Sequence, residues 1–349
     1  MSIEMIPFGT ANDCKAVELY TIKNNAGASA GILTYGGTLH TLSMPDKLGN
    51  FADILIGFDD LQGHMERSAY QGQLVGRYAN RLAHGEFEIT GKKYHVTKNE
   101  KGITCLHGGA EFSHAVWDAE IAGENALKLS YTSPAGSNGF PGELKAETVY
   151  TLTDDNELLI DFSAVSDEDT IINLTNHAYF NLGGYASGNV LGHVLQINAK
   201  HFTPTDKTSI PTGELRPVQG TPFDFTQPKT IGLEIEADYE QLINCKGYDH
   251  NFCLEKLAAG SPAAVVWEPV SGRVMEVFTD LPGVQLYTGN FLDNVPGKNG
   301  TVMNKHAGFC LETQYYPDTP NQPSFPQCTF KAGEAFKSRT SFKFSVCTA

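Results

Sequence analysis

The run Leu144-Lys-Ala-Glu-Thr-Val-Tyr-Thr-Leu-Thr-Asp-Asp-Asn-Glu-Leu-Leu-Ile-Asp-Phe-Ser-Ala164 decides the fold class of this chain. Mostly apolar side chains occupy every second position up to Leu152, and the alternation resumes at Leu158 after the turn residues Asp154-Asp-Asn156. A repeat of two residues is that of a β-strand with one buried face. The run therefore predicts two neighbouring strands joined by a short turn.

Similar short segments continue from this pair toward both ends of the chain. Turn residues separate them at intervals of about ten residues, a spacing typical of all-β sandwiches. One short helix is predicted by the helical spacing of Ile235, Tyr239 and Leu242. Further strands are expected in residues 30–37, 52–57, 86–90, 94–97, 126–132, 194–198, 250–254, 264–268, 274–279, 284–288 and 308–313.

The sequence thus predicts an all-β fold class, a large antiparallel β-sandwich with few short helices. Its 349 residues would also be enough for two domains of ordinary size. However, no long linker, charge block or fixed-period repeat divides the chain. We therefore expect a single domain over residues 1–349.

The next stretch, Ile171-Ile-Asn-Leu-Thr-Asn-His-Ala-Tyr-Phe-Asn-Leu-Gly-Gly184, carries a polar pattern. Read as a strand, it has one face of side chains that can form hydrogen bonds, with His177 at its centre. Such a face suits the floor of a polar cleft, but a sheet with one face in water gives the same pattern. The polar face comprises Asn173, Thr175, His177, Tyr179 and Asn181, and the other face Ile172, Leu174, Asn176, Ala178, Phe180 and Leu182.

Composition narrows the range of partners and compartments. The formal net charge of -15 would repel phosphate backbones and anionic membrane surfaces, so we expect no nucleic acid and no membrane partner. Seven cysteines without a C-x-x-C pair indicate neither a disulfide framework nor a zinc knuckle. Reduced thiols and an N-terminus without a targeting pattern are what a cytoplasmic protein would show.

Several classes of enzyme are disfavoured by missing motifs. The sequence contains no P-loop, no strand-coupled G-x-G-x-x-G, no H-E-x-x-H and no G-x-S-x-G. Its eleven histidines are scattered without metal-ligand spacing. We therefore expect neither a bound nucleotide cofactor nor a metal.

Two residues are candidates for acid–base chemistry. Glu312 alternates with apolar residues in Ala307-Gly-Phe-Cys-Leu-Glu-Thr-Gln314, and desolvation there would raise its pKa and make it a stronger base. A solvated strand glutamate fits the same pattern. His177 is either a structural histidine or an acid/base group with an ordinary pKa of about 6.5. A histidine acid and a carboxylate base suit proton transfer on a neutral polyol, but sequence spacing does not show that they meet.

Other polar residues have two interpretations each. His107 is followed by two glycines, which either let the backbone approach a ligand or form an ordinary turn. Asn80 and Arg81 could bind hydroxyl groups, or Arg81 could pair with an acidic neighbour. Asp249 could accept hydrogen bonds from hydroxyls or cap a turn. Gln285 lies in a strand that repeats the polar alternation of His177.

The chain resembles the aldose 1-epimerase (galactose mutarotase) family nearly end to end. The segments that carry the resemblance occur in the family's order. They are Gly76–Leu82, Leu106–Gly109, Asn176–Leu182, Phe202–Asp206, Ile210–Glu214, Thr221–Phe225, Tyr248–Phe252, Gly283–Asn290 and Glu312–Pro326.

This resemblance implies a fold, an activity and roles for particular residues. The fold would be the galactose mutarotase-like supersandwich with an open cleft. The activity would interconvert the α and β anomers of free aldohexoses such as galactose and glucose, without a cofactor. His177 would protonate the ring oxygen, Glu312 would take the proton from the C1 hydroxyl, and His107 would polarise or position the reacting atoms.

The resemblance also implies which residues bind the sugar. The expected contacts are Asn80, Arg81, His107, Tyr179, Asp249 and Gln285. A small-molecule sugar is the expected partner, and the protein would be a monomer or homodimer.

Two departures from the family pattern bear on sugar preference. Ala178 stands where many relatives have serine, and Glu111-Phe-Ser-His114 replaces a common Gly-Phe-Asp-Lys run. We expect both to lie near the cleft. A non-catalytic sugar-binding or sensor protein is a rival interpretation, although such a protein would not need both His177 and Glu312. A sugar-phosphate mutarotase would need extra basic residues, and the matched motifs place Arg81 alone at the cleft.

Overall fold

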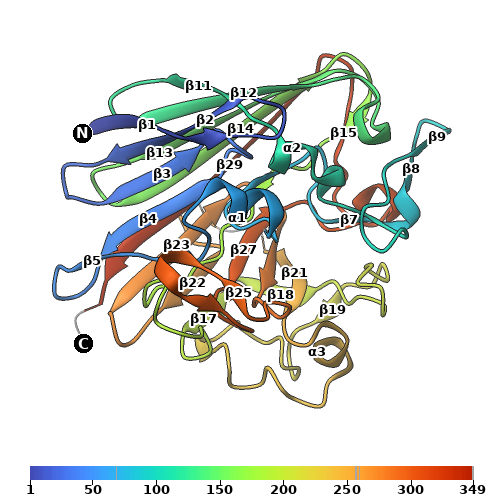
Figure 1. Ribbon diagram of the computed structural model, residues 1–349. Helices are drawn as coiled ribbons and strands as arrows, with labels where there is room; N and C mark the ends of the chain where they lie inside the picture. The colour runs from blue at the N-terminus through green and yellow to red at the C-terminus, as the bar shows by residue number, and fades with distance from the viewer. Residues whose placement is uncertain (68, 256–257, 259, 348–349) are drawn as a thin grey trace.

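The computed structural model describes residues 1–67, 69–255, 258 and 260–347, and three large antiparallel sheets form its framework (Figure 1). The largest has nine strands in the order β11-β12-β13-β14-β29-β23-β22-β17-β20. These strands are β11 (Asp118–Ile121), β12 (Ala126–Ser133), β13 (Leu144–Leu152), β14 (Glu157–Ser166), β29 (Ala335–Val346), β23 (Arg273–Thr279), β22 (Ala264–Trp267), β17 (Val194–Ile197) and β20 (Lys229–Thr230).

The two other large sheets have five strands each. The first follows chain order, with β1 (Ser2–Thr10), β2 (Ala16–Lys23), β3 (Ser29–Leu33), β4 (Leu39–Pro45) and β5 (Phe51–Asp53). The second has the order β19 (Arg216–Pro217), β18 (Ala199–Phe202), β21 (Asp249–Leu254), β24 (Gly283–Tyr287) and β27 (Cys310–Gln314).

Short strand pairs and helices complete the described chain. The pairs are β7 (Arg81–Leu82) with β10 (Cys105–Leu106), β6 (Leu74–Val75) with β16 (Thr175–Asn176), β8 (Glu86–Ile89) with β9 (Lys92–His95), β15 (Thr170–Ile171) with β28 (Thr329–Phe330), and β25 (Val295–Pro296) with β26 (Val302–Met303). The α-helices are α1 (Leu61–Glu66), α2 (Glu111–His114) and α3 (Glu240–Cys245), and the 3-10 turns are η1 (Ala83–Gly85), η2 (His107–Ala110), η3 (Ser137–Gly139), η4 (Lys298–Gly300) and η5 (Thr319–Asn321). Among the described helices, none is long and apolar enough to cross a membrane.

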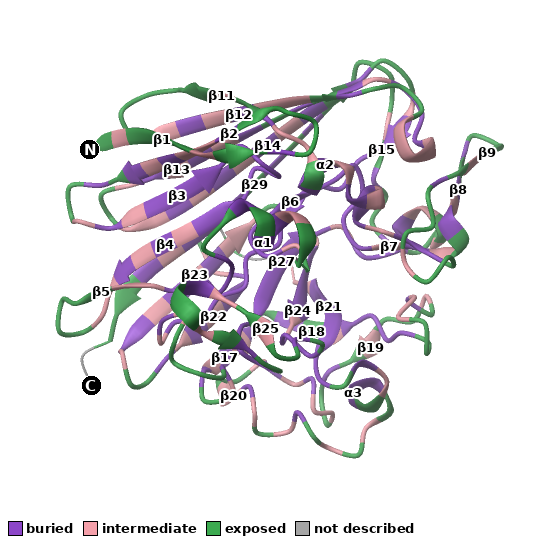
Figure 2. Cartoon of the chain, viewed as in Figure 1, coloured by how far each residue is buried: buried purple, intermediate pink, exposed green. Residues whose placement is uncertain are grey.

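The predicted all-β antiparallel sandwich is confirmed. In the deciding pair, Leu152 of β13 lies opposite Leu158 of β14, and buried positions alternate with more exposed ones along both strands. One apolar cluster, which extends in sequence from Tyr20 to Phe344, joins residues of all three large sheets. Figure 2 shows this buried interior as purple stripes along the strands. Burial of alternate apolar side chains therefore drives the sheets together.

Some strands escaped prediction. β1, β2 and β4 were not expected, and neither was β29, which at 12 residues is longer than any other described strand. β29 pairs with β14 and β23 in the middle of the nine-stranded sheet. Its buried positions include Ser338 and Thr340 beside phenylalanines, so hydrophobicity alone does not show the alternation. The helix predicted around Ile235 begins later, at Glu240.

The prediction of one continuous strand over residues 171–184 is wrong. Only Ile171 and the pair Thr175–Asn176 belong to strands there, while Asn173 and Phe180 form isolated bridges, and both predicted faces are buried. The side-chain N–H groups of Asn173 and Asn181 donate to backbone carbonyls of neighbouring segments at 3.0–3.3 Å. Polar side chains therefore satisfy buried backbone groups here, in place of a regular strand ladder.

A buried guanidinium fixes the segment that leads into β7. Arg77 is fully buried, and its Nε, Nη1 and Nη2 atoms donate five hydrogen bonds of 2.7–2.9 Å. The acceptors are the Ser133 hydroxyl and four backbone carbonyls in residues 133–142. Five donors in a rigid fork hold these two segments in one arrangement.

Replacing Arg77 should therefore destabilise the whole protein. Arg77→Met leaves the buried acceptors without donors, and we expect a loss of roughly 3–5 kcal/mol in the free energy of unfolding. Arg339→Met is the matched control, because Arg339 pairs with Asp161 at the exposed surface and should contribute at most about 1 kcal/mol. Urea unfolding of both variants measures the difference; equal losses would contradict this role of Arg77.

Candidate active site

The inner sheet face formed by β21, β24 and β27 carries the polar side chains of the site. The register places Gln285 between Asn251 and Glu312 in one cross-strand row, and Tyr287 beside Asp249 in the next. Alternation along each strand directs these residues to the same face. The three strands are buried along almost their whole length (Figure 2).

This face contributes to the lining of a cavity of about 500 Å³. Residues from the 171–184 segment, from the end of the Arg77 segment, from η2 and from several loops contribute the rest of the lining. A pocket of this size with a few convergent polar groups is typical of a small-molecule site. Of the residues predicted from sequence, the lining includes Asn80, Arg81, His107, His177, Tyr179, Asp249 and Glu312.

The structure brings His177 and Glu312 together. Nε2 of His177 lies 3.6 Å from Oε1 of Glu312, and both side chains are almost completely buried. Burial lowers the pKa of His177 to about 3. Burial, reinforced by the nearby Asp249 carboxylate, raises the pKa of Glu312 well above its ordinary value, while Arg81 opposes this increase. Desolvation thus favours the neutral form of both groups.

His107 lies beside this pair. Its ring centroid is 5.3 Å from that of His177, and its pKa is lowered by burial and by the nearby His177 and Arg81. The loop that carries His107 lies so close to the Arg77 segment that a Cβ on Gly108 would overlap the carbonyl oxygen of Gly76. Gly108 has a φ of 63°, so a side chain there would also strain the backbone.

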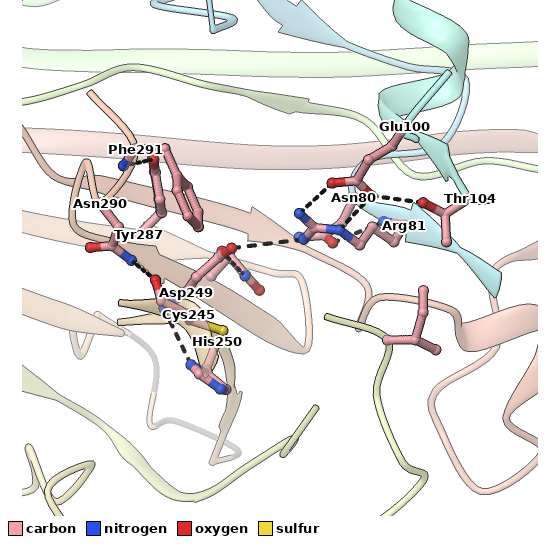
Figure 3. A network of polar contacts seen from close by, with 12 residues as sticks. Asn80, Arg81, Glu100, Thr104, Cys245, Asp249, His250, Tyr287, Asn290 and Phe291 are labelled. Carbon is pink, nitrogen blue, oxygen red and sulfur yellow. Dashed lines mark hydrogen bonds and ion pairs between the residues drawn. The ribbon is translucent and has the colours of Figure 1, made fainter. Parts of the chain in front are cut away.

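A chain of charged groups lies in the cavity wall (Figure 3). Nε and Nη2 of Arg81 each donate a 2.9 Å hydrogen bond to Glu100, and Nη1 lies 3.8 Å from Oδ2 of Asp249. Burial raises the pKa of Asp249, while attraction to Arg81 and the hydrogen bond from Gln285 oppose this increase. Arg81 therefore pairs with acidic neighbours, which is one of the two roles left open by the sequence, and it also lines the cavity. Its binding of hydroxyl groups stays a prediction.

Gln285 and Tyr179 support neighbouring site residues. Gln285 is buried outside the cavity lining, and its Nε2 donates a 2.7 Å hydrogen bond to Oδ1 of Asp249. This arrangement therefore favours support of Asp249 by Gln285 over direct contact between Gln285 and a sugar. The Tyr179 ring stacks on that of His177, with centroids 5.0 Å apart, and its hydroxyl donates to the carbonyl of Ala69.

Several lining residues were missed by the sequence analysis. Glu100 lies in a loop without strand or helix periodicity, so its pairing with Arg81 had no sequence signal. Tyr70 lies with its ring centroid 4.5 Å from that of His107, also from an irregular segment. The other lining residues outside the predicted set are Ala69, Lys101, Leu106, Lys207, Thr208, Ser209, Asn244, Lys246, Tyr287 and Phe291.

Neither family departure contributes to the described lining, although Ala178 lies between the lining residues His177 and Tyr179. Ala178 is buried within the main apolar cluster. Glu111 accepts hydrogen bonds from the hydroxyls of Tyr131 and Ser133, and Phe112 packs against Trp117. These positions therefore act through packing and not through direct contact with a ligand.

His107, His177 and Glu312 also come close enough to hold a metal ion, with one ligand atom of each within 4.8 Å of the others. Their separation in sequence gave no sign of this cluster. The backbone N–H of Asn80, however, donates to Nδ1 of His107 at 3.2 Å. A neutral His107 therefore carries its proton on Nε2, and a protonated nitrogen cannot ligate a metal. The arrangement favours hydrogen-bond donation by His107 over metal binding.

A family model described as aldose 1-epimerase matches residues 18–343. The galactose mutarotase of Homo sapiens is 44% identical over 317 residues, covering 90% of each chain. The aldose 1-epimerase of Escherichia coli K12 is 36% identical over 338 residues, covering 96% of this chain and 97% of that one. A crystal structure of an aldose epimerase homologue from C. elegans is 30% identical, with a TM-score of 0.88 over 95% of this chain and 100% of that one.

The lowered pKa of His177 predicts how the protein's stability depends on pH. Between pH 6.5 and about 3, His177 is protonated in the unfolded chain but not in the folded protein. The unfolded state then binds more protons than the folded state. The contribution of His177 to the free energy of unfolding is therefore full above pH 6.5 and is lost as the pH falls. His177→Gln should reduce the slope of the unfolding free energy against pH by up to about 1.4 kcal/mol per unit in this range. Urea titrations at several pH values test this; identical slopes would show that His177 takes up its proton without resistance.

Proposed function

The chain belongs to the aldose 1-epimerase family, and on that premise we propose that it interconverts the α and β anomers of free aldohexoses such as galactose and glucose. The observation that carries this proposal is the buried approach of His177 to Glu312 at 3.6 Å in a cavity of about 500 Å³. An acid and a base held side by side can serve the two oxygens bonded to C1 of one pyranose.

The reaction requires only proton transfers by these side chains. Glu312 takes the proton from the C1 hydroxyl while His177 gives a proton to the ring oxygen, and the C1–O5 bond breaks to leave an aldehyde. After rotation about C1–C2, the C5 hydroxyl adds to the other face of the carbonyl. Glu312 then returns a proton to the C1 oxygen and His177 regains its own, so both groups end as they began.

The neighbouring groups would hold the sugar in place during these steps. His107 donates from Nε2 to a sugar oxygen near the reacting atoms. Asn80, Arg81 and Asp249 bind hydroxyl groups of the sugar. Tyr179 contacts the sugar ring and orients His177, and Gln285 orients Asp249. We further propose that the protein acts without a cofactor, in the cytoplasm, as one domain in a monomer or homodimer. The free state of all seven cysteines supports a reducing compartment.

Removing either reacting group should abolish most of the catalysis. Positioned acid and base groups each contribute about 10²–10⁴-fold, so His177→Asn and Glu312→Gln should each lower the rate by that order. Because the two act as a unit, the double variant should be little worse than either single one. The optical rotation of freshly dissolved α-D-galactose measures the rate.

A matched control uses the same chemical change elsewhere. Glu276→Gln on β23 lies outside the cavity lining and should leave the rate unchanged. A wild-type protein that does not accelerate equilibration would rule out the enzyme and leave the sugar-binding interpretation. Full activity of both site variants would rule out the assigned roles.

A second candidate function is favoured by three lysines of the cavity lining, Lys101, Lys207 and Lys246. They come from separate loops, and none has an ion pair among the described residues. Unpaired cations at a cavity would attract a sugar that carries an anionic substituent, such as a hexose 6-phosphate. The basic residues that the sequence motifs lacked are therefore present in the folded protein.

Comparing glucose with glucose 6-phosphate tests this candidate. If the lysines serve a phosphate, kcat/KM for glucose 6-phosphate should exceed that for glucose, and the advantage should decrease with added salt. The Lys101→Ala, Lys207→Ala, Lys246→Ala triple variant should lose this advantage and retain its activity on glucose. If the wild type prefers glucose, the hexose-phosphate hypothesis is wrong and the free-hexose proposal is unaffected.

A further inference from the structure

The orientation of the His177 ring is only partly explained by its aromatic neighbours. Tyr179 stacks on it at 5.0 Å with an interplanar angle of 11°, and Tyr70 lies at 6.0 Å with an angle of 16°. Stacking fixes the plane of the ring. It does not distinguish between two orientations related by a half-turn, which exchange the nitrogen and carbon atoms at the ring edges. Another contact must select the orientation that directs Nε2 at Glu312.

Cys310 supplies a contact of that kind. Its Sγ lies 3.4 Å from Nδ1 of His177, on the opposite side of the ring from the Nε2 that faces Glu312. Cys310 is fully buried in a small apolar cluster that contains Ile56, Phe58 and Leu292. With apolar neighbours around it, the thiol has Nδ1 of His177 as its polar partner among the described residues.

The chemistry of a buried thiol determines what this contact does. Burial raises the pKa of Cys310 well above its ordinary value, so the group remains S–H. A sulfur that accepts from Nδ1–H keeps the ring proton on that nitrogen, which leaves the lone pair of neutral His177 on Nε2. When His177 gains a second proton on Nε2, Nδ1–H keeps the same acceptor. The thiol is weak in both directions, so it orients the ring without strongly stabilising either charge state.

We propose that Cys310 is a positioning residue of the site, selecting the ring orientation and the Nδ1–H tautomer, whose Nε2 can take up and give the proton of the reaction. This inference rests on the proposed acid role of His177. A carboxylate in the same place would stabilise the imidazolium and make His177 a weaker acid. Cys310 does not contact the sugar, so it should influence proton transfer and not sugar binding.

The direct test is the ¹⁵N spectrum of the imidazoles in the folded wild-type protein, with His177→Gln used to assign the signals. The shifts of the two nitrogens show which one carries the proton. We expect Nδ1 to be protonated and Nε2 to be an acceptor in the wild type. A wild-type neutral His177 protonated on Nε2 would overturn the proposal, whatever the activity of the protein.

Substitutions give the kinetic counterpart. Cys310→Ala should shift the ¹⁵N signals toward a mixture of tautomers and lower kcat about tenfold or more, with KM for galactose unchanged. Cys310→Ser retains a donor and acceptor and should restore the Nδ1–H tautomer and most of kcat. The acid side of the pH–rate profile should move in Cys310→Ala and return in Cys310→Ser.

Cys328→Ala separates positioning from packing. Cys328 is equally buried but belongs to a different apolar cluster, without His177. The Cys328→Ala variant should be less stable because of the new cavity, while its kcat and the ¹⁵N signals of His177 should match those of the wild type. If Cys310→Ala and Cys328→Ala behave alike, or if serine fails to restore the tautomer at position 310, Cys310 has only a packing role. If the wild type shows the expected tautomer but no mutarotation, the proposed reaction fails and the positioning contact stands.

Discussion

The contact between His177 and Glu312 places the strictest demand on this fold. Two ionisable groups lie 3.6 Å apart, both removed from water, and taking such groups out of water costs several kcal/mol per charge. A loose site would let water or a local rearrangement relieve that cost. The frame around the pair is therefore rigid: β27 is buried on both faces, and the 171–184 segment is tied to its neighbours by asparagine side chains.

The surrounding charges are arranged to limit the same cost. Arg81 lies between Glu100 and Asp249, so its charge is largely balanced within the cavity wall (Figure 3). Arg77, four residues earlier, meets only neutral acceptors and serves the backbone. One short segment thus provides a structural arginine and a cavity arginine, and the anchoring of the first fixes the position of the second.

The sequence allowed the sheets to be predicted better than the cavity. Residues 144–164 alternate because one face is buried, and that physical cause acts locally. In residues 171–184 the same alternation has another cause, since the segment passes through the interior and its polar side chains bond to backbone. Glu312 could be recognised as a carboxylate among apolar neighbours. Glu100 could not, because its partnership with Arg81 arises only when two irregular loops meet.

The opposite pKa directions of His177 and Glu312 have a consequence for catalysis. Without sugar, the pair holds one shared proton in its uncharged arrangement, a carboxylic acid beside a neutral imidazole. The reactive arrangement, a carboxylate beside an imidazolium, differs from it by the movement of that one proton between Oε1 and Nε2. No net charge enters the cavity, and the two new charges attract each other. A neutral sugar whose hydroxyl and ring oxygen meet these atoms can therefore exchange protons with the pair in either direction, as an epimerisation requires.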